Sequence, residues 1–201
     1  MEATAAVYKG KKQKKGLSTL DIVLMAILAI VHGIAMTYVA LLNQVLTAMG
    51  GPILTSVIIG LFTIHGVLAM YIIRKPGAAL VTCLISGVVQ ILAGNPNGLI
   101  SMVAASSYGV GIEVAFAFFK YRRYDFITLS IAGFTSMPIW FVIAGFWFGY
   151  INWGVMVMIT AFLVRCLSGV ILSGWISKIL GDTLSKTGIL NGFNISTKKS
   201  A

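Results

Sequence analysis

The sequence predicts an all-α integral membrane protein of six transmembrane helices, with both termini on the cytoplasmic side. The first observation is composition, because 58% of the 201 residues are hydrophobic, only 10% are charged, and the mean hydropathy is +0.96. Water-soluble globular domains rarely have such values. The second is that apolar residues gather into six long runs, and the third is that the basic residues between the runs fall on one side.

Each run is long enough to cross hydrocarbon about 30 Å thick at roughly 1.5 Å per helical residue, although the third is the shortest. The runs are continuously apolar, which favours helices over membrane-spanning strands, where inward and outward residues alternate. The predicted helices, in chain order, are Leu20–Leu42, Ile53–Ile73, Ala78–Ala93, Leu99–Phe119, Phe126–Tyr150 and Trp153–Leu180.

The chain is predicted to form one membrane domain over 1–201. A basic segment over 1–18 precedes the helices of 20–180, and a tail over 181–201 follows them. All of the 15 Lys and Arg residues except Arg165 belong to the N-terminal side of the predicted membrane. The positive-inside rule places that side in the cytoplasm, so the net charge of +10 requires no nucleic-acid partner.

The loops on the opposite side are neutral and rich in amides. They cover Asn43–Pro52, Gly94–Gly98 and Tyr150–Asn152, and none contains Lys or Arg. A polar, uncharged entrance suits a small organic solute. The alternative is that these residues simply form turns.

Glu113 and Arg165 are the clearest ionisable residues inside the predicted membrane, where a charge is costly and normally faces a cavity or a partner. Counted from the outer side, both lie about 18 to 21 Å deep. Two interpretations follow. They form a buried ion pair between the fourth and sixth helices, or Glu113 contacts a ligand.

Helical spacing places Ser106, Gly109, Val110 and Glu113 on one face of the fourth helix. The third helix continues a matching stripe of small and polar residues towards its outer end, which holds Cys83, Ser86, Gly87, Gln90, Gly94 and Asn97. Such stripes line a cavity or pack closely on a neighbouring helix. Gln90 would lie in the outer half.

Trp140 and Trp147 lie one heptad apart, in the aromatic outer half of the fifth helix. Trp140 lies about 15 Å below the outer end, too deep for an interfacial belt. Both are candidates for stacking on a flat ring, with ordinary core packing as the alternative. His32 and His65 lie near mid-membrane, where we expect neutral rings bonded to neighbouring helices.

Several kinds of chemistry have no motif here. The chain contains no GxxxxGK[ST] phosphate loop, no HExxH and no GxSxG, and Cys83 and Cys166 are isolated. We therefore expect no enzyme activity, no metal and no cofactor. Active transport would need an ion gradient or a separate ATPase.

Three segments resemble the YkoE-type S-components of energy-coupling factor (ECF) transporters. They are Gly94-Asn95-Pro96-Asn97-Gly98, Gly109-Val110-Gly111-Ile112-Glu113-Val114-Ala115-Phe116 and Lys120-Tyr121-Arg122-Arg123, and the first helix from Asp21 to Asn43 is similar too. The resemblance implies a multi-pass subunit of the bacterial cell membrane that binds thiamine or its hydroxymethylpyrimidine precursor. It also implies a transmembrane coupling subunit and two cytoplasmic ATPases as partners.

The resemblance suggests roles for the candidate residues. Glu113 would pair with the ring nitrogen and amine of an aminopyrimidine, so Glu113→Gln should weaken thiamine binding. Gln90 and Asn97 would complete the polar edge, with Ser106 on the face of Glu113. Trp140 and Trp147 would stack on the rings, and Tyr108 or Asn43 would close the mouth.

Family members often contact the coupling subunit through a small-residue face of the first helix. The nearest match in this chain is Ala26, Ala29 and Gly33, which departs from the usual AxxxA spacing. Two other classes stay open as alternatives: a stand-alone secondary transporter or channel for a small organic cation, and an intramembrane enzyme.

Overall fold

The computed structural model describes residues 16–190 and 192–197, and this part of the chain is helical without a strand. The predicted basic segment lies outside it up to residue 15, as do Lys198 and Lys199. The elements are α1 (Thr19–Ile58), η1 (Ile59–Thr63), α2 (Ile64–Ile73), α3 (Ala78–Leu92), α4 (Ile100–Phe118), α5 (Phe126–Thr135), α6 (Met137–Trp147), η2 (Tyr150–Trp153), α7 (Val155–Ser168), η3 (Gly169–Trp175), α8 (Ile176–Lys186) and α9 (Asn194–Thr197).

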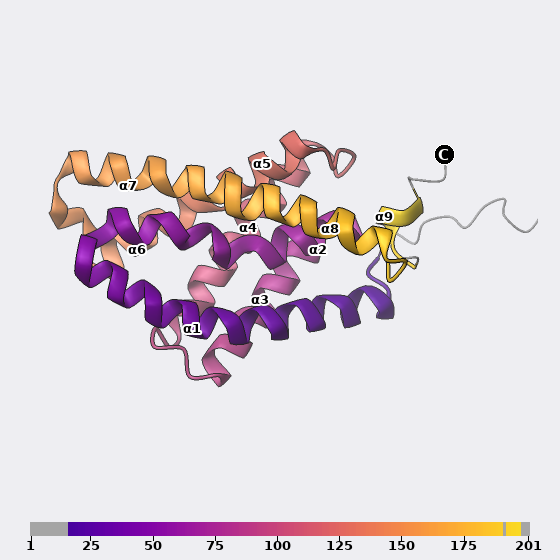
Figure 1. Cartoon of the computed structure of the whole chain (residues 1–201), viewed down its shortest axis with the longest axis horizontal. Helices are drawn as coiled ribbons and strands as arrows, with labels where there is room; N and C mark the ends of the chain where they lie inside the picture. The colour runs from indigo at the N-terminus through magenta and orange to yellow at the C-terminus, as the bar shows by residue number, and fades with distance from the viewer. Residues whose placement is uncertain (1–15, 191, 198–201) are drawn as a thin grey trace, which may run out of the picture.

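The first two predicted helices are both found, joined by a very short reversal inside α1 (Figure 1). Helical backbone continues beyond Leu42, so the prediction of a loop over 43–52 is wrong for most of its length. The chain turns at Gly50 and Gly51, where Gly51 has φ +60°, a conformation that glycine adopts without strain. Pro52 follows the reversal, at the start of the next helical stretch. Proline lacks a backbone N–H, but in the first turn of a helix that group would have no intrahelical partner.

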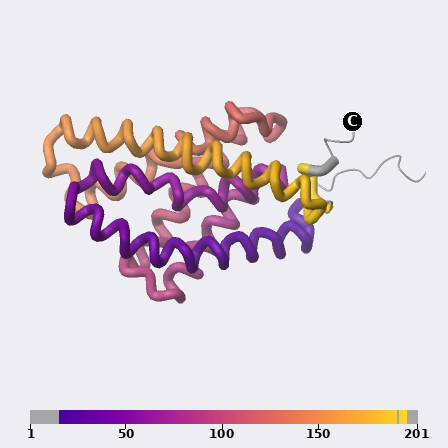
Figure 2. The backbone as a smooth tube through the Cα atoms, viewed as in Figure 1, coloured from indigo at the N-terminus to yellow at the C-terminus, as the bar shows by residue number. Residues whose placement is uncertain are grey.

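Four described helical stretches are long and apolar enough to span a membrane. The first, Thr19–Ile73, contains the reversal and therefore passes twice, and α3 is a shorter apolar helix of 15 residues. The other three are α4, α5–α6 and α7–α8, and they follow one another along the bundle in the predicted order (Figure 2).

The fifth and sixth passes are not regular helices. A break at Ser136 separates α5 from α6, one residue before the first turn of α6, which contains Pro138. The sixth pass runs from α7 through η3, a π-helical turn, into α8. Gly133 of α5 and Gly169 of η3 touch backbone to backbone, which leaves no room for a side chain.

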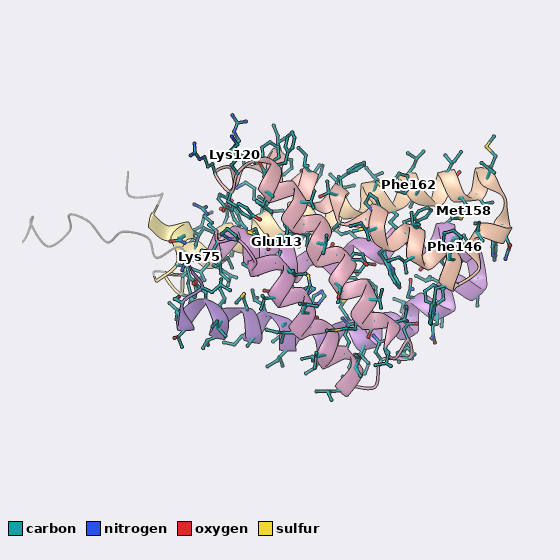
Figure 3. All side chains as sticks on the ribbon, turned by 180° about the vertical axis from the view of Figure 1, so that it is seen from behind. Lys75, Glu113, Lys120, Phe146, Met158 and Phe162 are labelled. Atoms are coloured by element: carbon teal, nitrogen blue, oxygen red, sulfur yellow. The ribbon has the colours of Figure 1, made fainter. Side chains whose placement is uncertain are left out.

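Basic and aromatic residues occupy opposite ends of the bundle. Figure 3 shows Lys75 and Lys120 at one end, and Phe146 and Met158 at the other. At the basic end Lys75 forms an ion pair of 2.6 Å with Asp21, which joins the start of α1 to the connection after α2. The start of α1 and α9 also lie at this end (Figure 1), as expected when both ends of the chain face the cytoplasm.

Two buried clusters fill the bundle. One surrounds α2 in the basic half and includes Met70, Ile112, Phe116 and Leu129. The other lies towards the aromatic end and includes Tyr108, Met137, Trp140 and Tyr150. The second cluster borders the cavity described next.

Candidate ligand-binding cavity

A cavity that is partly open to solvent lies between the helices in the half of the bundle away from the basic end. Its wall comes from α1 to α4, α6 and α7 and from the connections between them. The lining residues are Asn43, Thr55, Ile59, Phe62, His65, Gln90, Asn97, Ile100, Ser101, Ala104, Ala105, Tyr108, Trp140, Ala144, Phe148, Tyr150 and Arg165.

Amides line one part of the cavity and are held by neighbouring polar groups. The Nδ2 of Asn95 donates to the Oε1 of Gln90 at 2.9 Å, and the Oδ1 of Asn95 accepts from the backbone N–H of Asn97 at 2.9 Å. Asn43 accepts from the hydroxyl of Thr55 across the α1 reversal. These bonds fix Gln90 and Asn43 as directional partners for a ligand.

Aromatic rings form a second part of the wall. The Trp140 ring meets Tyr108 and Phe148 edge-on, each at 6.3 Å between ring centroids. Phe148 in turn stacks on Tyr150 at 5.6 Å. Phe148 and Tyr150 lie in the connection after α6, so we call them, together with Asn97, the outer rim of the cavity.

His65 and Arg165 form the floor of the cavity, deeper in the bundle than the outer rim. Arg165 is 1% exposed and lies over the Phe141 ring, with its Cζ 5.1 Å from the ring centroid. His65 is 3% exposed and stacks on His32 at 3.8 Å. The sequence singled out both residues, yet assigned neither to the ligand, because their surroundings depend on how the helices pack.

Five of the predicted ligand residues line the cavity: Asn43, Gln90, Asn97, Tyr108 and Trp140. Ser106 does not, because it faces another side of α4 and donates to the Met102 carbonyl at 2.7 Å. Trp147 is 64% exposed, so it projects away from the bundle. The prediction that Ser106 and Trp147 belong to the same cavity therefore disagrees with the described geometry.

Glu113 is also outside the lining, because its carboxylate is engaged at the basic end of the bundle (Figure 3). Its Oε1 accepts from the backbone N–H groups of Ala79 and Leu80, at 3.0 and 3.4 Å, in the first turn of α3. Its Oε2 accepts from the Tyr121 hydroxyl at 2.9 Å. This is a helix-capping role, and the contact of Glu113 with a ligand stays a prediction.

The Tyr121 hydroxyl stays protonated in this arrangement. Burial, together with the hydrogen bond to Glu113, raises the pKa of Tyr121 to about 12. Glu113 and Arg165 form no ion pair within 16–190 and 192–197, where the salt bridges are Asp21–Lys75 and Lys178–Asp182. The alternative of a buried Glu113–Arg165 pair is therefore wrong.

The small-residue face of α1 packs inside the chain. Ala29 is fully buried, and a Cβ on Gly33 would lie 2.8 Å from the Cγ1 of Val89 in α3. Ala26 is only partly buried. Gly33 thus packs on α3 and Ala29 is buried within the chain, and the contact of this face with a coupling subunit stays a prediction.

No group of three or more His, Cys, Asp or Glu side chains that could hold a metal occurs in the described chain. The cavity instead offers amides, hydroxyls, an imidazole and a guanidinium among aromatic rings. Such a wall suits a flat heteroaromatic solute, which needs stacking surface and directional hydrogen bonds.

Comparison with known proteins gives consistent results. A family model described as the permease component of an ABC-type cobalt transport system matches residues 20–139. YkoE of Bacillus subtilis (strain 168), provisionally named an HMP/thiamine permease protein, is 34% identical over 178 residues, 89% of each chain. A crystal structure of an S-component of an ECF transporter superposes with a TM-score of 0.89 at 32% identity, over 92% of this chain and 94% of the other.

Proposed function

This chain belongs to the YkoE-type S-components of ECF transporters, and on that premise we propose that its cavity captures thiamine or hydroxymethylpyrimidine (HMP) on the outer side of the bacterial cell membrane. The observation that carries the proposal is the cavity itself, with Trp140, Tyr108 and Phe148 beside the fixed amides Gln90 and Asn43. Aromatic rings offer stacking to a pyrimidine, and amides match both its acceptor nitrogens and its amine.

The position of the cavity supports capture from outside. It lies in the half of the bundle away from Lys75 and Lys120, and the positive-inside rule places these lysines in the cytoplasm. A ligand arriving from the medium therefore meets the outer rim first.

An S-component works as part of an ECF transporter. For this chain we propose a transmembrane coupling subunit and two cytoplasmic ATPase subunits as partners, with ATP hydrolysis confined to the latter. The chain would then be a binding subunit and not an enzyme, in agreement with its lack of a phosphate-loop motif.

The decisive experiment is to purify the full chain in detergent, identify by mass spectrometry any small molecule released from it, and titrate the protein with thiamine and HMP. We expect one molecule of either compound per chain. Retention of neither compound, together with uptake of an organic cation into vesicles containing this chain alone, would replace the proposal with a secondary transporter or channel.

A chemical control separates binding from catalysis. Bound thiamine or HMP should be recovered unchanged after prolonged incubation with the protein. Recovery of an altered product would make the chain an intramembrane enzyme instead.

A further inference from the structure

The guanidinium of Arg165 lacks hydrogen-bond partners at two of its nitrogens. Its Nε and Nη1 are buried and have no acceptor, although the residue is 1% exposed and lines the cavity. Phe141 supports the guanidinium from one side but accepts no hydrogen bond in its plane. Buried N–H donors without acceptors are costly, so the missing acceptors are expected to come from whatever occupies the cavity.

The His65 ring, which lines the same cavity as Arg165, also lacks hydrogen-bond partners. Both ring nitrogens, Nδ1 and Nε2, are buried without a partner. The stacked His32 has its own bonds, because its Nε2 lies 2.9 Å from the Leu61 carbonyl oxygen. His32 thus holds the His65 ring in place and leaves both of its nitrogens for a ligand.

The charges around the cavity are unbalanced. Its lining contains Arg165 but neither Asp nor Glu, so nothing in the lining neutralises the guanidinium. A positively charged group next to the Arg165 guanidinium would be repelled, because the effective dielectric constant of a buried site is lower than that of water. A neutral ring with acceptor nitrogens would be attracted.

We propose that Arg165 and His65 determine the orientation of the ligand. The heteroaromatic ring lies at the floor, where Arg165 donates to an acceptor nitrogen of that ring and His65 supplies a second hydrogen bond. A positively charged substituent then points away from the floor to the outer rim, where Phe148 and Tyr150 stack and can attract a cation. This inference rests on the proposed function and adds the direction of binding.

The test compares two ligands that share a pyrimidine and differ in charge. HMP is neutral, whereas thiamine carries a positively charged thiazolium. Both are titrated into the full-length protein and into Arg165→Gln, with Arg123→Gln, the same change in an exposed loop of the basic end, as the matched control. We expect Arg165→Gln to weaken both ligands by a similar factor, at least roughly 10-fold, and Arg123→Gln to change neither.

Two outcomes would overturn the orientation. If Arg165→Gln weakened HMP but strengthened thiamine, Arg165 would face the thiazolium. If it changed neither affinity while the parent chain bound both ligands, Arg165 would have no role in recognition. A parent chain that bound neither ligand would instead overturn the proposed function itself.

Thermal unfolding separates ligand recognition from a structural role. Because two donors of Arg165 have no acceptor, Arg165→Gln should not lower the unfolding midpoint of the ligand-free protein, yet it should reduce the rise caused by HMP. A lower ligand-free midpoint with an unchanged rise would show a structural residue. Arg165→Lys keeps the charge but not the planar donor pair, so we expect an affinity between those of the parent and Arg165→Gln.

Discussion

Trp140 and Trp147 form a natural comparison at the residue scale, because they share α6 and differ in surroundings. Trp140 is 6% exposed and lines the cavity, whereas Trp147 is 64% exposed. We predict that Trp140→Ala weakens HMP binding by about 2 kcal/mol, roughly 30-fold, while Trp147→Ala leaves it unchanged. Titration of the purified variants measures both effects.

Trp140→Phe is a third variant, for use if Trp140→Ala is too unstable to study. Phenylalanine keeps an aromatic ring in the buried cluster. We expect a several-fold loss of affinity from it. Equal losses from Trp140→Phe and Trp147→Ala would contradict the placement of the cavity.

Glu113 is expected to act on stability and not on affinity. Glu113→Gln removes the charge that accepts from Ala79, Leu80 and Tyr121, so the free energy of unfolding should fall by about 1 kcal/mol. Affinity for thiamine and HMP should stay within about 2-fold. Chemical unfolding in detergent and titration test this prediction, and unchanged stability with lost binding would return Glu113 to the ligand site.

The sequence led to Glu113 because helical spacing shows which residues share a face but not which neighbour that face meets. The face of α4 with Gly109 packs on Leu80 and Cys83 of α3. A different face, with Ser101, Ala105 and Tyr108, lines the cavity. The position of Glu113 along the helix also separates it from the cavity, since Glu113 lies five residues before the end of α4 at Phe118.

At the element scale, the contact between α5 and η3 is the tightest constraint on the bundle. A Cβ on Gly133 would overlap the Gly169 carbonyl, and one on Gly174 would lie 2.8 Å from the Leu129 carbonyl oxygen. We predict that Gly133→Ala costs about 1 to 3 kcal/mol of stability, because backbone must move to admit the methyl group. Thermal unfolding in detergent measures this cost.

Gly145→Ala is the matched control for Gly133→Ala. A Cβ on Gly145 would lie 3.5 Å from the Cε of Met158, an ordinary contact, so this variant should be neutral or slightly stabilising. Similar losses of stability from both variants would contradict the conclusion that the close contact of Gly133 with η3 causes the loss.

Hydropathy predicted the long apolar helices because the thickness of the hydrocarbon layer sets the length that a membrane-spanning run must have. It did not predict the break at Ser136, the π-helical turn η3, or the short reversal at Gly50 and Gly51. These features depend on contacts between passes. Gly51, for example, lies against Trp153, which is 102 residues later.

At the scale of the whole molecule, orientation can be tested with single cysteines. The native Cys83 and Cys166 are buried, so an added cysteine on the surface should be the reactive one. We predict that a membrane-impermeant thiol reagent modifies Asn152→Cys in intact cells, and modifies Arg123→Cys only after the membrane is opened. The reverse pattern would place the outer rim in the cytoplasm.

The tryptophans give the protein an optical reporter of its own. The chain has four, Trp140, Trp147, Trp153 and Trp175, and among them Trp140 belongs to the cavity lining. A stacked heteroaromatic ligand should quench its emission and leave that of the other three largely unchanged. Intrinsic fluorescence can therefore follow occupancy of the cavity without a label, and its loss in Trp140→Phe would assign the signal.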